Sequence, residues 1–136
     1  MPPRQASVKL VLLHHAGIAH PHYDLMFETA PDSLLTTFRF PTLPSSKRTI
    51  VEKLQDHRRD YLDYEGPISG GRGEVRRLMS HWCELIADRS GWIDATGTQV
   101  IDSYHLTFLE PRAPFDRQPQ IIKLTSNEWQ AWTEPY

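Results

Sequence analysis

Apolar residues in this sequence occur in short runs separated by Pro, Gly, Asp and Ser, a pattern typical of β-strands joined by turns. Residues 8–13 form an apolar run that predicts a buried strand, and residues 22–28 predict the strand that returns beside it. Residues 30–33 carry a turn signal, and residues 34–40 alternate between the two faces of a further strand. Residues 41–46 (PTLPSS) predict a loop, because proline cannot donate to a strand ladder.

The second half of the chain predicts further strands. Residues 74–79 and 82–88 look like two strands, although the link between them has little turn signal. Residues 100–109 and 120–124 predict two more. Residues 47–54 stay open between a short helix and a strand, because their Ile, Val and Leu residues suit either.

Helical structure is predicted only in short pieces. Residues 56–64 are polar without alternation and predict a loop with a helical turn. Residues 125–128 (TSNE) resemble a capping box, and Trp129 and Trp132 have the spacing of a final helical turn packed on the body. We therefore expect a single domain over residues 1–136 with a mainly β fold, a compact small β-barrel of about six to eight strands with short helical segments.

The composition is that of an ordinary globular protein, with 39% hydrophobic and 24% charged residues, which argues against wholesale disorder. A single cysteine, Cys83, excludes an internal disulfide and a thiolate-rich metal site, and its strand-like context predicts a buried thiol. No apolar run reaches the roughly 18–20 residues of a membrane span, and residues 1–9 lack a signal-peptide pattern. We expect a soluble, cytoplasmic protein without a membrane partner.

Charge is distributed unevenly along the chain, although the net charge is only −2. Residues 39–77 carry nine Lys and Arg against six Asp and Glu, a local charge of +3. Residues 78–136 carry four against eight, a local charge of −4. A basic middle segment can contact phosphates while the whole protein stays acidic, so the charge permits a nucleic-acid partner without requiring one.

Histidines gather in one stretch, since four of the seven lie between His14 and His22. His20, His22 and Asp24 occupy alternate positions, so in a β-strand their side chains would share one face. Two imidazoles and a carboxylate suit a divalent metal and leave positions for water or a substrate oxygen. The alternative is a half-exposed strand whose histidines only form hydrogen bonds.

Two blocks of the sequence carry a resemblance when they are taken in order. The first block is His22-Tyr23-Asp24 followed by Glu28. The matching residues of the second block are Asp56, His57, Asp60, Tyr61, Glu65, Gly66, Ile68 and Gly70, with Tyr64 where the pattern has Phe. In this order and at this distance the blocks resemble the 3'-phosphoesterase module of bacterial DNA ligase D and its stand-alone relatives. The resemblance covers residues 10–80 well and the remainder loosely.

The resemblance implies a compact β-barrel that binds manganese, with zinc or cobalt as alternatives. It implies hydrolysis of 3'-terminal phosphates or 3' ribonucleotides from DNA ends during repair, with any ligase or polymerase partner acting in trans. The implied metal ligands are His22, Asp24 and an upstream histidine. His15 stands one residue too far from His22 for the family spacing, so a one-residue bulge or loop insertion would have to bring it in. His14 is the second candidate.

His57 and Tyr61 correspond to the family residues that contact the scissile phosphate. The chemistry is coherent without the family, because a phosphoester needs a cation to neutralise its non-bridging oxygens and to lower the pKa of a water. A nearby His57 can stabilise developing charge as imidazolium or protonate the leaving oxygen, and a tyrosine hydroxyl can donate to a phosphate oxygen.

Departures from the family pattern concern the residues that grip phosphate. Met26 stands where the pattern has an arginine, and Thr42 stands where it has a lysine. Arg48 could correspond to a second family arginine only with another one-residue shift. Losing a bidentate phosphate clamp removes about a few kcal/mol of anion binding or transition-state stabilisation. The residues that could compensate as phosphate contacts are His20, Arg39 and Arg72.

Three functions compete at this point. The first is a metal-dependent phosphoesterase acting on nucleic-acid 3' ends or a related phosphorylated substrate, which His57 and Tyr61 favour. The second is a catalytically weakened accessory module that binds metal and nucleic acid, which Met26 and Thr42 favour. The third is an ordinary β-barrel binding module in which the motif is residual.

Overall fold

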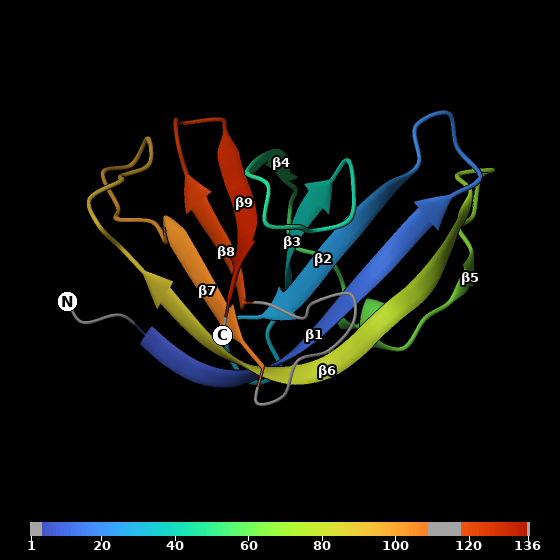
Figure 1. Ribbon diagram of the computed structural model, residues 1–136, viewed down its shortest axis with the longest axis horizontal. Coiled ribbons are helices and arrows are strands. Elements are labelled where there is room, and N and C mark those ends of the chain that lie inside the picture. The colour runs from blue at the N-terminus through green and yellow to red at the C-terminus, as the bar shows by residue number, and fades with distance from the viewer. Residues whose placement is uncertain (1–3, 109–117, 136) are drawn as a thin grey trace.

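The computed structural model describes residues 4–108 and 118–135. Within them, eight antiparallel strands close into a barrel in the order β1-β2-β3-β4-β9-β8-β7-β6, with β6 pairing back onto β1 (Figure 1). A further strand, β5, pairs with one end of β6. The predicted small, mainly β barrel is therefore confirmed. The strands are β1 (Arg4–Ala16), β2 (His22–Glu28), β3 (Leu35–Phe40), β4 (Thr49–Lys53), β5 (Gly66–Pro67), β6 (Glu74–Asp88), β7 (Ser103–Thr107), β8 (Gln118–Lys123) and β9 (Trp129–Glu134).

One apolar cluster fills the barrel interior, and alternate positions of all eight barrel strands contribute to it. Four aromatic rings pack together in this cluster, with neighbouring ring centroids 5.1 to 6.3 Å apart. They are Phe27, Phe38, Tyr104 and Trp129, from β2, β3, β7 and β9. Because these strands lie far apart in the sequence, the interior ties the whole barrel together.

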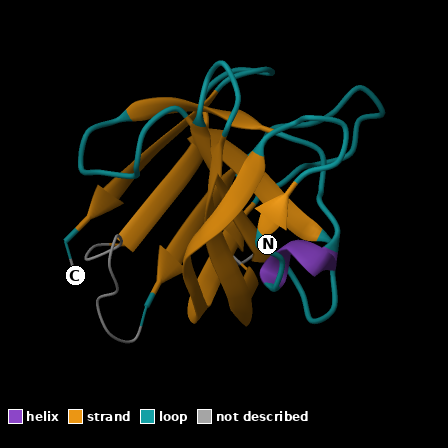
Figure 2. Ribbon diagram, turned by 90° about the vertical axis from the view of Figure 1, so that its right-hand side faces the viewer, coloured by secondary structure: helices purple, strands orange, loops and turns teal. Residues whose placement is uncertain are grey.

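β1 is apolar on both faces because both faces are covered. Leu10 and Leu12 face the barrel interior, whereas Val11 and Leu13 alternate to the outer face and join a second apolar cluster. That cluster packs beneath residues 54–73, which we call the covering segment. The segment carries the single described helix, the 3₁₀ turn η1 (Arg59–Leu62), which lies beside the strands in Figure 2. The helical turn predicted within residues 56–64 is confirmed.

Residues 74–88 form one long strand, so the two separate strands predicted there are wrong. The pairing of β6 with β1 shifts by one residue between Leu12 and Leu13, opposite Met79 and Arg77, which leaves Leu78 as the extra residue of a bulge. Val75 packs in the outer cluster and Met79 in the interior, although residues four apart in a regular strand share a face. The change of face between Val75 and Met79 therefore comes from a bulge within one strand and not from a turn between two strands.

The final helical turn predicted around Trp129 and Trp132 is also wrong, because these residues lie on β9. The capping contact itself forms, since the Glu128 amide donates to Thr125 Oγ1 at 3.0 Å. The Leu124 amide also donates to the Glu128 carbonyl at 2.8 Å, which closes a hairpin instead of opening a helix. Burial alternates along β9 with a period of two, so strand packing overrides the local helix signal.

The remaining predicted elements have mixed outcomes. Residues 47–54, left open above, contain the strand β4. The strand predicted over residues 100–109 is shorter, and its last residue lies outside the described residues. Cys83 is buried as predicted, and burial, with a smaller contribution from Glu84, raises the pKa of its thiol to about 12. No helix among the described residues has the length and apolar character needed to span a membrane.

Candidate active site

Strand pairing brings three of the predicted metal ligands together. His15 at the end of β1 lies directly opposite His22 on β2, and Leu13 lies opposite Asp24. The two histidines and the aspartate therefore project from the same outer face, and their ligand atoms all lie within 4.8 Å of one another. The pairing between β1 and β2 runs without a bulge, so the bulge that the sequence suggested for His15 is not needed. Residues 17–21 form the loop between the strands.

His14, the second candidate ligand, lies on the other face of β1. Its ring stacks on Tyr23 with the centroids 4.7 Å apart, and Tyr23 packs against the barrel interior. Because consecutive residues of a strand point to opposite faces, His14 and His15 cannot serve the same centre. The geometry selects His15.

Backbone carbonyls fix the orientation of both imidazoles. His15 Nε2–H donates to the Arg72 carbonyl at 2.6 Å, and His22 Nδ1–H donates to the His20 carbonyl at 3.1 Å. The proton of each neutral ring is thereby used, and the remaining nitrogens, His15 Nδ1 and His22 Nε2, face each other at 3.1 Å. Two lone pairs at that distance repel unless a proton or a cation lies between them. Metal-binding histidines typically donate their other ring N–H to a carbonyl in this way.

Asp24 completes the group with its two carboxylate oxygens turned in different directions. Oδ2 lies 3.6 Å from His22 Nε2, while Oδ1 accepts a hydrogen bond from Arg39 Nε at 3.2 Å. The carboxylate is 4% exposed, so the Arg39 guanidinium compensates a charge that burial would otherwise penalise. Burial is the largest influence on His22 and lowers the pKa of its imidazole below the ordinary value. The neutral ring that results is the form that binds a metal.

Two of the three separations between the ligand atoms fit a single divalent cation, and the third, between His15 and Asp24, is at most 4.8 Å. Nitrogen and oxygen ligands lie about 2.0–2.2 Å from zinc, so two atoms that share an ion lie within about 4.2 Å of each other. The His15–His22 and His22–Asp24 separations of 3.1 and 3.6 Å meet this limit. Two imidazoles and one carboxylate could therefore hold a metal ion and leave coordination positions open.

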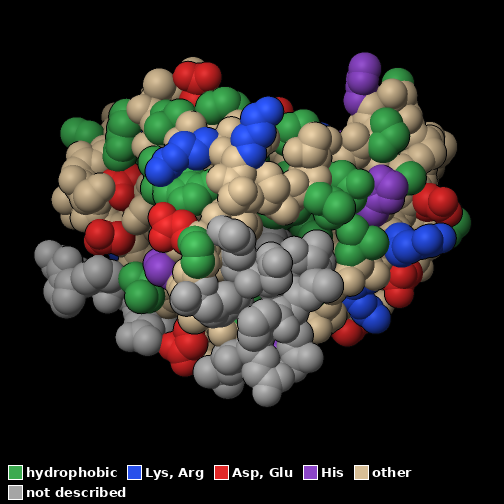
Figure 3. All heavy atoms as spheres, viewed as in Figure 1, with side chains coloured by type: hydrophobic (Ala, Val, Ile, Leu, Met, Phe, Trp, Pro, Cys, Tyr) green, Lys and Arg blue, Asp and Glu red, His purple; other side chains and the backbone are tan. Residues whose placement is uncertain are grey.

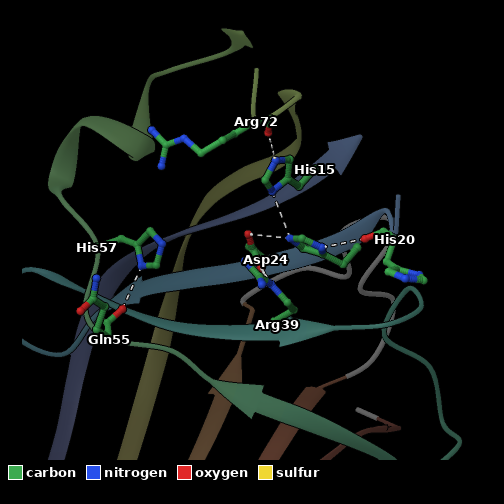
Figure 4. A network of polar contacts seen from close by, with 8 residues as sticks. His15, His20, Asp24, Arg39, Gln55, His57 and Arg72 are labelled. Atoms are coloured by element: carbon green, nitrogen blue, oxygen red, sulfur yellow. Dashed lines mark hydrogen bonds and ion pairs between the residues drawn. The ribbon is translucent and has the colours of Figure 1, made fainter. Parts of the chain in front are cut away.

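A small pocket is lined by two of the three ligands, His15 and Asp24, and by most of the other predicted site residues. Its volume is about 140 Å³. The covering segment supplies His57, Tyr61 and Arg72, and β3 supplies Arg39 (Figure 4). The remaining lining residues are His15, Asp24, Met26, Ile68 and Val75. Residues from β1, β2, β3, β6 and the covering segment thus surround one space.

His57 is oriented by its own backbone neighbourhood. Its Nδ1–H donates to the Gln55 carbonyl at 2.9 Å, and its other ring nitrogen points toward the Asp24 side of the pocket in Figure 4. The Tyr61 ring lies edge-on to the His57 ring with the centroids 5.7 Å apart. His57 is therefore placed to exchange a proton with a group in the pocket through Nε2.

Two arginines share the pocket with Met26. Arg39 reaches it from β3, and the Arg72 guanidinium extends on the His57 side in Figure 4, held by Ser69 through a 2.8 Å bond from Nε to the carbonyl. Met26 is 2% exposed and belongs to the second apolar cluster. Its side chain forms an apolar part of the pocket wall. Positive charge is therefore present in the pocket although Met26 supplies none.

Two predicted phosphate contacts lie elsewhere. The His20 side chain is exposed and points away from Asp24 (Figure 4), because β2 begins only at His22 and the predicted alternation does not extend through Pro21. Histidine side chains also project on the surface at this end of the molecule (Figure 3). Arg48 stacks on Trp132, with its guanidinium carbon 3.9 Å from the ring centroid, and donates to Gln130 at 3.2 Å. It does not line the small pocket.

Sequence reasoning missed the polar contacts that hold the covering segment. Arg59 Nη1 lies 2.6 Å from the buried Glu28 carboxylate and donates to the Ser33 carbonyl at 2.7 Å. Burial alone would raise the pKa of Glu28, but the Lys9 amide and the Arg59 guanidinium lower it below its ordinary value. The signal was present, because a glutamate inside an otherwise apolar strand needs a cationic partner.

A second set of contacts fixes the end of the segment. The Arg77 amide and guanidinium both bind the Glu65 carboxylate, and Gly73 passes close to β1 with φ +79°. A Cβ atom at Gly73 would lie 2.2 Å from the Ala16 carbonyl oxygen, so only glycine lets the adjacent Arg72 carbonyl reach His15. Residues 70–73, which include three glycines, therefore help to orient His15 of the candidate metal-ligand group.

Comparison with known proteins adds no assignment to this geometry. No protein-family model matches the sequence, and no curated protein matches it. The case for a function rests on the pocket, on the metal-ligand group and on the motif resemblance.

Proposed function

We propose that this protein is a divalent-metal-dependent phosphoesterase that processes 3'-phosphate or 3'-ribonucleotide ends of DNA. The observation that carries the proposal is one pocket in which His15 and Asp24, two members of the metal-ligand group, lie together with His57, Tyr61 and two arginines. Metal ligands, a proton-transferring imidazole and phosphate-binding cations are the three components that phosphoester hydrolysis needs. The motif resemblance supplies the DNA 3' end as the substrate.

The residues divide the reaction between them. A divalent ion, with manganese proposed first and zinc or cobalt as alternatives, would neutralise phosphoryl oxygens and acidify a water. Arg39 and Arg72 bind the remaining phosphoryl oxygens, and the Tyr61 hydroxyl donates to one of them. His57, with Nδ1 held by Gln55, protonates the leaving 3'-oxygen or stabilises the charge that develops on it.

A second function, a metal- and DNA-end-binding module without turnover, is favoured by one observation. Met26 occupies the pocket wall where the family pattern has an arginine. Arg39 and Arg72 oppose this reading, because both reach the same pocket. Turnover separates the two functions.

The deciding assay measures phosphate release from a 3'-phosphorylated primer–template with Mn²⁺. We expect turnover by the wild type and a loss of about 10³-fold or more for His22→Ala, because metal stabilisation of the transition state amounts to several kcal/mol. For His57→Ala we expect a loss of about 10²–10⁴-fold with Mn²⁺ affinity retained. His14→Ala is the matched control, since its side chain adjoins His15 in sequence but faces the barrel interior.

Two results would count against the enzyme. Mn²⁺ binding without turnover of any 3'-end substrate favours the binding module. Turnover that survives both His22→Ala and His57→Ala means that another part of the chain, or a contaminating enzyme, carries the reaction.

A further inference from the structure

A groove much larger than the small pocket lies on the other side of the metal-ligand group. Its volume is about 970 Å³, within the roughly 300–1,000 Å³ typical of small-molecule sites. The β1–β2 loop forms one wall with Ile18 and Pro21, and Pro41 and Ile50 face them from the end of β3 and from β4. Ile50 is 49% exposed, so it presents an apolar surface to this groove.

The groove adjoins the candidate active site. Arg39 lines both spaces, His22 lines the groove, and Asp24 lines the small pocket. In Figure 4 Arg39 and Asp24 lie between His57 on one side and His20 on the other. A substrate whose phosphoryl group is at Asp24 therefore reaches the groove on passing Arg39.

The small pocket is too small to hold more than the reacting group. Its volume of about 140 Å³ corresponds to roughly five water molecules at about 30 Å³ each. An ion and a phosphoryl group fill that space. The organic part of a phosphoester must lie outside it, and the groove is the adjoining space of sufficient size.

The lining of the groove favours a neutral, partly apolar group over a further phosphate. Aliphatic and proline side chains on facing walls suit the faces of a ring system. Glu52 contributes a carboxylate that disfavours a second phosphate, and Asn127 contributes an amide that can donate and accept. A sugar and base, with apolar faces and polar edges, meet these requirements.

We infer that the groove binds the terminal nucleoside of the strand whose 3'-phosphate lies at the metal centre. The inference rests on the proposed function, because it takes the phosphate to lie beside Asp24. Nucleoside binding in the groove makes the protein selective for nucleoside 3'-phosphates over small phosphoesters. Ile50 is then a specificity-determining residue distant from the reacting atoms.

The test compares the affinities of thymidine 3'-monophosphate and inorganic phosphate by titration calorimetry with Mn²⁺ present. It uses the full chain with His57→Ala, so that bound nucleotide is not turned over. We expect the nucleotide to bind about tenfold or more tightly than inorganic phosphate, because the nucleoside buries apolar surface in the groove. Ile50→Glu should abolish this ratio, and the uncharged Ile50→Ala should lower it.

Ile93→Glu is the matched control, since Ile93 is 61% exposed and does not line the groove. Equal affinities for the two ligands, or a ratio that Ile50→Glu and Ile50→Ala leave unchanged, overturn the inference. The proposed activity is judged separately by wild-type turnover. Turnover without nucleotide selectivity would contradict only the proposal that the groove binds a nucleoside. Nucleotide selectivity without turnover would contradict only the proposed phosphoesterase activity.

Discussion

The inner and outer faces of β1 and β2 are held in different ways. All eight barrel strands contribute to the inner face, so its side chains become exposed only when strand pairing is lost. The outer face is covered by residues 54–73, attached through the Leu35–His57 backbone pair and the ion pairs of Arg59 and Arg77. We therefore expect the covering segment to open while the barrel stays folded.

This difference divides the candidate active site. The candidate metal ligands His15, His22 and Asp24 project from paired strands of the barrel. His57 and Tyr61 belong to the covering segment and depend on its attachment. Metal binding and turnover should thus respond differently to mutations in the barrel, in the covering segment and at the contact between them.

Phe38→Ala acts on the inner face and should have the largest effect. Phe38 is fully buried, and its ring contacts Phe27, Tyr104 and Trp129. Removing it leaves a cavity that should lower the free energy of unfolding by about 3–5 kcal/mol. Urea denaturation followed by tryptophan fluorescence measures the change. Phe38→Leu should cost less, and a loss below about 1 kcal/mol for Phe38→Ala would contradict the shared interior.

Arg59→Ala acts on the covering segment and should have the next largest effect. It leaves the buried Glu28 carboxylate without its cation, at a cost of about 2 kcal/mol. Displacement of His57 and Tyr61 should reduce turnover by about 10²-fold, since errors near 1 Å have effects of that size. Mn²⁺ affinity should change little, because the metal ligands lie on the strands.

Hydrogen exchange locates the effect of Arg59→Ala. Amides of the covering segment should exchange faster, while those of β7 and β8 keep their protection. The exposed neighbour Arg58 provides the control Arg58→Ala, which should leave exchange and turnover unchanged. Uniformly faster exchange across the barrel would show that the segment does not open on its own.

Strand alternation made much of this arrangement predictable from the sequence. His22 and Asp24 lie two apart on a strand, and the motif resemblance paired them with His57 and Tyr61. The sequence position of His20 fits the same alternation, but β2 begins only at His22, after Pro21, so His20 lies in the loop. Local periodicity does not show where a strand begins.

Long-range register was beyond the sequence. The bulge at Leu78 depends on how β6 pairs with β1, and nothing around residue 78 marks it as a turn or a kink. The position of the Arg48 side chain could not be predicted either, because it stacks on Trp132, which lies 84 residues away in the sequence. The hairpin at Thr125 shows the same limit, since one capping contact serves a helix or a turn until β8 and β9 pair.

Gly73→Ala acts where the covering segment meets the metal centre, with a smaller effect. A methyl group there would collide with the Ala16 carbonyl, so the Arg72 carbonyl must move away from His15. Loss of the carbonyl contact that orients His15 should reduce Mn²⁺ affinity by about 10–100-fold, measured by competition with a chelating dye. Gly71→Ala is the matched control, because Gly71 has φ +67° but no atom within 4 Å of an added Cβ. Equal losses for both variants would assign the effect to backbone strain alone.

The smallest predicted effect is a pH dependence of the free energy of unfolding, which arises from the Glu28–Arg59 ion pair between β2 and the covering segment. The folded-state pKa of Glu28 lies below its ordinary value of 4.5, since the Lys9 amide and Arg59 outweigh burial. The unfolded chain therefore binds the Glu28 proton more tightly, so ionised Glu28 stabilises the fold above pH 4.5. That stabilisation is lost as the pH falls through the lower, folded-state pKa.

Glu28→Gln tests this assignment. The single amide oxygen replaces only one of the two carboxylate oxygens that accept from Lys9 and Arg59, but the variant leaves no buried carboxylate without its cation. At pH 7 it should therefore lose less stability than Arg59→Ala does. The difference between wild type and variant, measured by urea denaturation, should shrink as the pH falls from roughly 5 to roughly 3. Asp32→Asn is the control, because Asp32 lies 3.7 Å from the same guanidinium but is 95% exposed. A difference that stays constant over this range would mean that Glu28 is not the titrating group, and the covering segment would then rest on its backbone and apolar contacts.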